Sequence, residues 1–78
     1  MKMVHIVWLD SCSDERWLTQ EQMKQHCIST CNSVAYLYSK DSRQVKIVQS
    51  ISNLEHYSEV MAIPRKAIIS MVELEEKK

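Results

Sequence analysis

Glycine is absent from this chain of 78 residues. Glycine normally supplies the positive φ angles of β-hairpins and bulges, and it forms the phosphate-binding loops of many nucleotide enzymes. Its absence excludes both a dinucleotide-binding fingerprint and a P-loop. A β-rich chain without glycine must use Asn or Asp where φ is positive, and we expect this at Asn32, Asp41 and Asn53.

Long hydrophobic runs and an excess of charge of one sign are also missing. No run is long enough for a signal peptide or a membrane span, so we expect a cytoplasmic protein without a membrane partner. The three cysteines are an odd number, which in a cytosol predicts reduced thiols. Ten basic and ten acidic residues cancel, and this balance excludes the positive field that broad non-specific DNA binding uses.

Groups for catalysis are lacking too. The sequence has no convincing pair of carboxylates, no nucleophile with a credible base, and no glycine for an oxyanion loop. Cys12, His26, Cys27 and Cys31 are the only metal-like set, but the spacing of Cys12 and His26 is irregular for a zinc site. We therefore predict a protein that is not an enzyme, with no catalytic residue, no metal and no cofactor.

The length allows one domain, and that domain is small. A chain of this size buries only about 60–65% of its unfolded surface, so small domains often gain stability from partner subunits. The apolar fraction of 45% is ordinary, which argues against disorder. We expect residues 1–74 to form a single small β-barrel domain, followed by a charged tail at 75–78.

Alternating apolar residues and turn-forming loops predict a chain of strands with one short helix. The expected strands are Met3–Leu9, Ile28–Ser39, Gln44–Ser50, Tyr57–Ile63 and Ala67–Leu74. Thr19 and Gln22 have the spacing of a capping box, which predicts a helix at Gln20–Cys27. A helix of about two turns does not persist alone, so we expect it to dock on the sheet through Trp17 and Leu18.

A tight corner at Pro64-Arg65-Lys66 separates the last two predicted strands. Five short strands, a helix after the first and this corner before the last favour a mainly β fold. That fold is either a small five-stranded SH3-like or Sm-like barrel or a strongly bent antiparallel sheet. Met3–Leu9 and Ala67–Leu74 are apolar on both alternating faces. A strand of that kind is central or contacts another subunit, so we expect a homo-oligomer.

Short motifs follow one another along nearly the whole chain. They are Val7–Ser11, Trp17, Ser29–Thr30, Val34–Leu37, Val48–Ser52 and Ile63–Ile69. Together they resemble a group of short, largely uncharacterised proteins encoded by phages and prophages. The resemblance implies a phage origin. By analogy with other small phage proteins, it also implies a factor that disables host defences or redirects host enzymes. Some such factors act as oligomers that sequester a nucleotide signal. Arg16 and Ala35 stand where those relatives tend to carry glycine, so we expect the conformation of the first loop to differ.

The loop after the first predicted strand offers one candidate ligand site. Asp10 and Ser11 begin this loop and Trp17 ends it. One interpretation places them with Trp8 around a pocket, where a planar ligand stacks against the tryptophans while the carboxylate and hydroxyl fix its orientation. The other places Trp8 in the core, lets Asp10 accept backbone N–H groups in the turn, and leaves Trp17 as a lid or a contact residue.

The corner offers a second candidate. Arg65 and Lys66 form a basic patch with Arg43 and Lys46 if the corner and the preceding hairpin meet on one side. Sm-like barrels hold single-stranded RNA at such positions through stacking and phosphate contacts. The alternative is a solvated turn.

The sequence as a whole favours a non-enzymatic binding protein that acts as an oligomer in the host-cell cytoplasm. Its partner is a small nucleotide signal that it sequesters or a host protein that it blocks, and the alternative function is Sm-like binding of single-stranded RNA. The candidate ligand-binding residues are Trp8, Asp10, Ser11, Trp17, Arg65 and Lys66.

Overall fold

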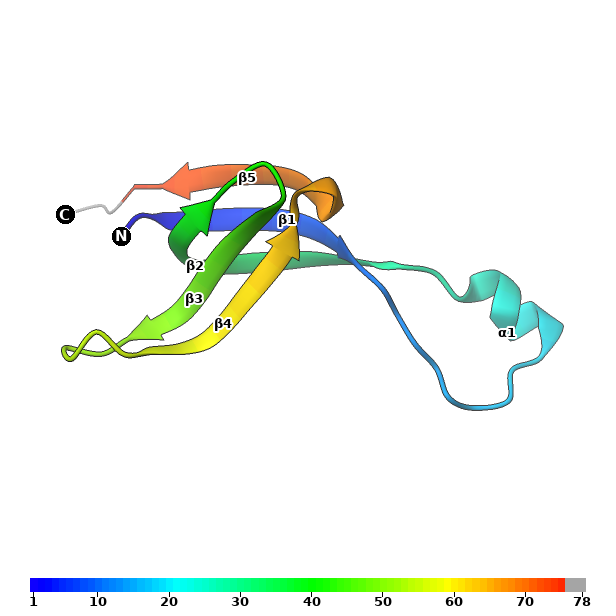
Figure 1. The fold of residues 1–78 in the computed structure, drawn as a ribbon. Coiled ribbons are helices and arrows are strands. Elements are labelled where there is room, and N and C mark those ends of the chain that lie inside the picture. The colour runs from blue at the N-terminus through cyan, green and yellow to red at the C-terminus, as the bar shows by residue number, and fades with distance from the viewer. Residues whose placement is uncertain (76–78) are drawn as a thin grey trace.

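The computed structural model describes residues 1–75, which form one open antiparallel sheet of five strands, a short helix and a 3₁₀ turn (Figure 1). In chain order the elements are β1 (Met3–Asp10), α1 (Gln20–Gln25), β2 (Ser29–Lys40), β3 (Gln44–Ile51), β4 (Tyr57–Pro64), η1 (Arg65–Ala67) and β5 (Ile68–Leu74). The prediction of a mainly β fold with five strands and one short helix is confirmed. Of the charged tail predicted at 75–78, the residues 76–78 lie outside the described part of the chain.

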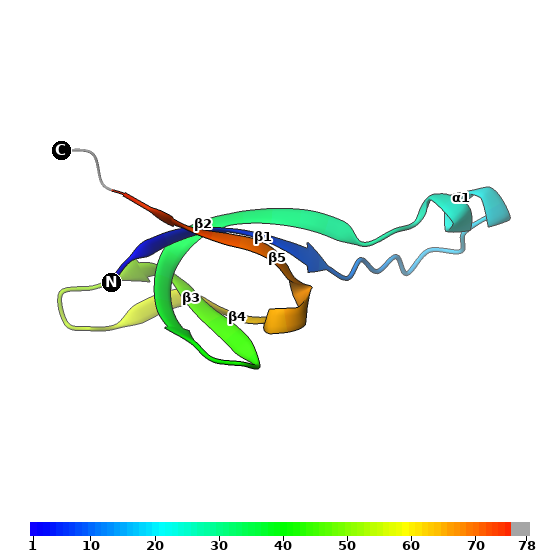
Figure 2. The same cartoon turned by 90° about the horizontal axis from the view of Figure 1, so that it is seen from above.

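The strands lie in the order β4-β3-β2-β1-β5, so β5 returns to pair with the far side of β1. The long β2 serves both halves of the sheet, because its first part pairs with β1 and its last part pairs with β3. Register shifts next to Tyr38 in β2 and next to Ile69 in β5 mark two irregularities of the ladder. Bulges of this kind bend and twist strands, and the sheet curls strongly (Figure 2).

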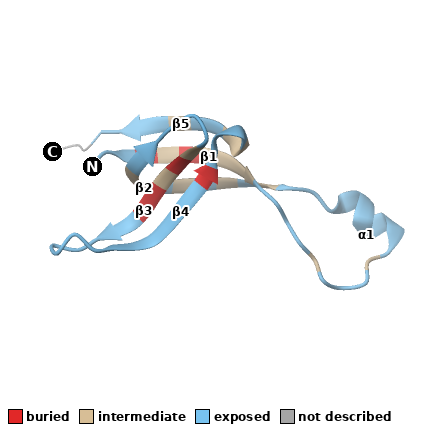
Figure 3. Cartoon of the chain, viewed as in Figure 1, coloured by how far each residue is buried: buried red, intermediate tan, exposed pale blue. Residues whose placement is uncertain are grey.

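The core lies inside this curl and is small. It consists of six buried side chains that come from four strands, and half-buried Trp8, Leu37, Ala67, Ile68 and Met71 pack against it. The six are Val4, Ile6, Ala35, Val45, Ile47 and Ile63. Because alternate residues of a strand point to opposite faces, the other half of the apolar side chains lies on the outer face of the curl, where most of the surface is exposed (Figure 3).

The helix begins as predicted but does not dock on the sheet. Thr19 accepts a hydrogen bond from the backbone N–H of Gln22, and the Gln22 side chain accepts one from the backbone N–H of Thr19, so the capping box is confirmed. The helix ends at Gln25, none of its residues is buried, and it lies away from the sheet (Figure 1). The prediction of docking through Trp17 and Leu18 is therefore wrong. The physical reason is that Met23 is the only apolar residue of α1, so docking would bury little apolar surface.

Positive φ angles occur elsewhere than predicted. In the described residues the non-glycine positions with positive φ are Glu55 at 59° and Glu59 at 56°, and not Asn32, Asp41 or Asn53. Asn32 lies inside the regular ladder of β2, which requires extended backbone. The left-handed region is unfavourable for a residue with a Cβ atom by roughly 1–2 kcal/mol. Because the chain has no glycine, this unfavourable backbone conformation falls on two glutamates near the β3–β4 hairpin.

The small core makes a direct prediction about stability. Ile63 is only 1% exposed and packs inside the curl, whereas Ile69 is 59% exposed. Truncating a buried isoleucine to alanine typically costs about 2–5 kcal/mol, while exposed truncations usually change stability by less than about 0.5 kcal/mol. We expect Ile63→Ala to lower the free energy of unfolding in urea by an amount in the first range and Ile69→Ala to have little effect. Equal losses in dilute, monomeric samples would contradict the position of the core.

Candidate functional site

The structure separates the two tryptophans of the first candidate site. Trp8 is half-buried against the core, and its indole N–H donates a hydrogen bond of 3.0 Å to the Ser33 hydroxyl. Trp17 lies beyond the end of β1 and is fully exposed. A side chain that is fully exposed packs against nothing, so it does not form a wall opposite Trp8. Asp10 and Ser11 are both exposed at the point where β1 leaves the sheet.

The second candidate site, at Arg65 and Lys66, required the corner and the preceding hairpin to meet, and they do. The backbone N–H of Arg65 in η1 donates a hydrogen bond of 2.9 Å to the carbonyl of Arg43 in the β2–β3 turn. The corner and the hairpin therefore meet, and exposed Lys66 is next to Arg65 in the same 3₁₀ turn. A shallow cavity of about 300 Å³ lies beside them, lined by Asp41, Arg43, Gln44, Ala62 and Pro64.

Asp41 fixes the conformation of this turn. Its carboxylate accepts hydrogen bonds of 2.7 Å from the backbone N–H of Arg43 and 2.9 Å from that of Gln44. These two bonds lower the pKa of Asp41 below its usual value, and the positive charges of Arg65 and Lys46 lower the pKa further. Lys46 and Arg65 are both close enough to this carboxylate for their charges to act on it, and we call Arg43, Lys46 and Arg65 the basic group.

A pocket made by two tyrosines lies on the outer face, next to this basic group. The rings of Tyr38 and Tyr57 meet edge to face with 5.4 Å between their centroids, and the Lys46 ammonium lies 5.8 Å from the centroid of Tyr38. Together with Val60 and the buried Val48 they line a cavity of about 180 Å³. We call these five residues the tyrosine pocket.

The tyrosine pocket combines two aromatic walls, an apolar floor and one cation at its rim. Aromatic faces stack on planar rings, and a lysine beside them favours a negatively charged group. The position of Tyr38 follows from the register shift in β2, which lies between Leu37 and Ser39. The arrangement suits a ligand that has a planar ring joined to an anion.

Sequence reasoning placed Lys46 in a basic patch but did not find its tyrosine partners. A usable signal was present in the predicted hairpin turn at residues 40–43, because counting outward from it places Lys46 opposite the region of Tyr38. Tyr57 carried no comparable signal. It reaches Tyr38 from β4, two strands away, and only the curl of the sheet brings the two rings together.

The cysteines and histidines do not assemble into a metal site in the part of the chain that the structure describes. Cys12 shares a hydrogen bond with the Ser29 hydroxyl, and the His26 ring lies 3.0 Å from the Cys12 carbonyl. Among residues 1–75 no group of three or more His, Cys, Asp or Glu side chains could hold a metal ion. Within the same residues, no helix has the length and apolar character needed to cross a membrane.

Comparison with known proteins does not add a family. No family model matches the chain, and neither a curated protein nor a solved structure gives a significant match.

The role of Asp41 predicts a specific dependence of stability on pH. A carboxylate with a lowered folded-state pKa stabilises the fold above its ordinary pKa of 3.8, and this contribution is lost as the pH falls through the lowered value. We expect Asp41→Asn to be less stable than the parent protein at neutral pH and the difference to shrink in acid. Urea midpoints measured between about pH 2 and pH 7 check this. If Asp41→Asn instead runs parallel to the parent protein over this range, the turn does not depend on this carboxylate.

Proposed function

We propose that this protein is a non-enzymatic binding protein that acts as an oligomer and sequesters a small nucleotide-like ligand. The observation that carries the proposal is the tyrosine pocket, where the Tyr38–Tyr57 pair and Lys46 surround the apolar floor made by Val48. Aromatic walls with a few well-placed polar groups are typical of small-molecule sites. A nucleotide offers both the planar ring and the negative charge that this arrangement suits.

The cations next to the tyrosine pocket indicate where the phosphate groups of a bound nucleotide would lie. Lys46 belongs both to the tyrosine pocket and to the basic group at the hairpin, and Arg43 and Arg65 are joined there by a backbone hydrogen bond. A base stacked on the tyrosines would place its phosphates toward these side chains. Arginine and lysine favour phosphate oxygens through charge-assisted hydrogen bonds. The second predicted site, at Arg65 and Lys66, thus becomes the phosphate end of one extended site.

The fold supports a place among small SH3-like or Sm-like barrels. The fifth strand lies beside the first, and a one-turn 3₁₀ helix precedes it. Full closure of the sheet into a barrel, with β4 joining β5 within one chain or between chains, belongs to this proposal. Because the chain resembles phage and prophage proteins, we propose that it acts as a counter-defence or host-modulating factor in the cytoplasm of the host cell.

Binding of single-stranded RNA is the second candidate, and a specific observation favours it. The cations at the corner and the hairpin continue into an aromatic platform, and proteins that hold single strands combine a positive track with stacking rings. The neutral net charge of the chain speaks against long contacts with many phosphates. The two candidates differ in how affinity grows with ligand length.

The tyrosine pocket predicts the effect of substitutions on ligand binding. We expect the protein to bind ATP or cyclic di-AMP in isothermal titration at low salt, and Tyr38→Ala to weaken binding by roughly 5- to 150-fold, the range for loss of one stacking ring. Tyr38→Phe keeps the ring and should retain binding. Lys46→Ala should weaken binding, whereas Lys40→Ala, an exposed lysine of the same hairpin outside the tyrosine pocket, should not.

The same titrations separate the alternatives. Affinity for a U-rich RNA that rises with the length of the strand and falls steeply with salt would favour the RNA-binding function. Recovery of the intact nucleotide after heat denaturation would favour sequestration over hydrolysis. Binding of neither nucleotides nor RNA, or equal binding by Tyr38→Ala and the parent protein, would refute the ligand site.

A further inference from the structure

The chain exposes far more surface than a compact protein of its mass. Its accessible surface is 6720 Å², whereas a compact monomer of 9.2 kDa exposes about 4,900 Å². Its radius of gyration is 16.0 Å, against about 11.5 Å for a compact domain of 78 residues. The chain thus exposes roughly 1,800 Å² more than a compact monomer of its mass.

The segment 11–28, which we call the arm, contributes to this excess. It leaves the sheet at the end of β1, carries α1 at its tip and returns at the start of β2, so that the molecule is 50 Å long (Figure 2). The apolar side chains of the arm are unburied: Trp17 is fully exposed, Met23 is 58% exposed and Ile28 is 57% exposed.

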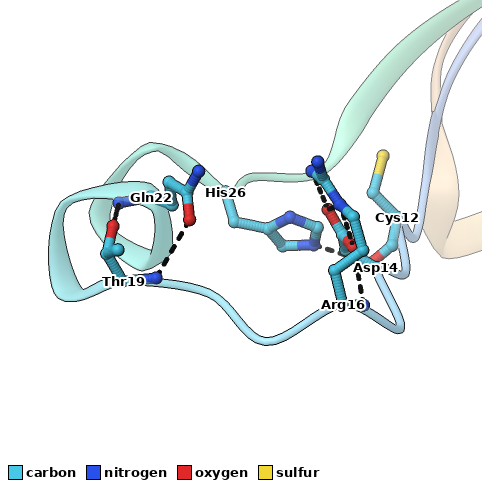
Figure 4. A network of polar contacts seen from close by, with 6 residues as sticks. All are labelled: Cys12, Asp14, Arg16, Thr19, Gln22 and His26. Carbon is cyan, nitrogen blue, oxygen red and sulfur yellow. Dashed lines mark hydrogen bonds and ion pairs between the residues drawn. The ribbon is translucent and has the colours of Figure 1, made fainter.

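Local bonds nevertheless hold the arm in a defined shape (Figure 4). The Arg16 guanidinium makes two-pronged contacts of 2.7 and 3.0 Å with the Asp14 carboxylate, and these contacts lower the pKa of Asp14. His26 reaches back across the loop to the Cys12 carbonyl, and the capping box closes the first turn of α1. An arm that is already ordered loses less conformational entropy when it binds, which favours association.

A receiving surface is present on the outer face of the sheet. The strand registers place Leu74 of β5, Met3 of β1 and Tyr36 of β2 side by side, and Val72 and Val34 flank His5 in the next row. Four of these side chains, Met3, Val34, Val72 and Leu74, are exposed apolar groups. We call these six residues the outer patch. It lies on the β5-β1-β2 half of the sheet and adjoins the tyrosine pocket, because Tyr36 is the register partner of Val48.

We propose that a second copy of this chain covers both surfaces, with the arm of each protomer packed on the outer patch of its partner. The arm points away from its own sheet, so it cannot reach its own patch (Figure 1). Each chain carries one arm and one patch, and a two-fold dimer therefore satisfies both at once. Burying the excess of roughly 1,800 Å² on each chain falls in the size class of obligate homodimers. This inference rests on the oligomer of the proposed function and names its contact surfaces.

The first test is the mass of the protein in solution. We expect sedimentation velocity and native mass spectrometry to show a dimer, with twice the chain mass of 9.2 kDa, at micromolar concentration. Combining Trp17→Ala with Met23→Ala should raise the dissociation constant by roughly 30-fold or more, as for a hot-spot tryptophan. Both side chains are exposed in the single chain, so circular dichroism should show an unchanged fold. Leu54→Ala, an exposed apolar truncation in the β3–β4 turn, should leave the dimer intact.

A mixing experiment separates arm-on-patch contact from other dimers. Val72→Glu places a charge in the outer patch and should also dissociate the homodimer. Mixing the arm variant with Val72→Glu leaves one intact arm facing one intact patch, so the heterodimer should be tighter than either homodimer. A dimer made by arm-to-arm contact would show no such gain, and that outcome would overturn the proposal. So would a monomeric parent protein at about 100 μM, which is far above typical dissociation constants of stable dimers.

Titration of ATP and cyclic di-AMP into the monomeric arm variant keeps this inference distinct from the ligand site. Retained nucleotide binding by the monomer, together with a dimeric parent protein, supports both proposals. A dimeric parent protein that binds no nucleotide would support the packing of the arm on the partner's outer patch and refute the ligand function. A monomeric parent protein that binds nucleotide would support the ligand function and refute the dimer.

Discussion

Burial of six apolar side chains inside the curl of the sheet is the interaction on which the rest of the structure depends. Val4 and Ile6 of β1 meet Val45 and Ile47 of β3 only because the sheet bends back on itself, and Ile63 brings β4 into the same cluster. Residues 1–75 form one sheet and no second layer that covers its other face. Curling therefore buries the apolar side chains of the inner face in the core. Those of the outer face stay exposed, where a ligand or a second chain can contact them.

The outer face divides between these two uses. On the β3-β4 half, Val48 is buried beneath the tyrosines and becomes the floor of the tyrosine pocket. On the β5-β1-β2 half, the outer patch has no cover from residues 1–75, and the arm that could supply one projects in another direction. The two regions adjoin on β2, where Tyr36 of the outer patch precedes Tyr38 of the tyrosine pocket, so a partner arm on the outer patch would lie beside the pocket.

Local features of this fold could be predicted from the sequence, and long-range ones could not. Strand periodicity located each of the five strands within one or two residues, and the Thr19–Gln22 pair located the start of α1. The meeting of Arg43 with Arg65 was foreseen only as a condition, because it depends on how far the sheet bends. The pocket between Trp8 and Trp17 and the docking of α1 were not realised, since both assumed that the loop after β1 folds back. Residues 11–16 of this loop are mostly polar and provide little apolar surface to draw it back onto its own sheet.

The lack of glycine links the shape of the sheet to its candidate site. The chain has no glycine, and the ladder of β2 is irregular at Tyr38, while Glu59 in β4 adopts a left-handed backbone. Bulges re-aim the side chains next to them. Tyr38 lies at the register shift and Tyr57 lies two residues before Glu59, and the two rings meet with Lys46 beside Tyr38. The bends that close the core thus also bring the two rings together, so a substitution that straightened either strand would disturb the core and the tyrosine pocket at the same time.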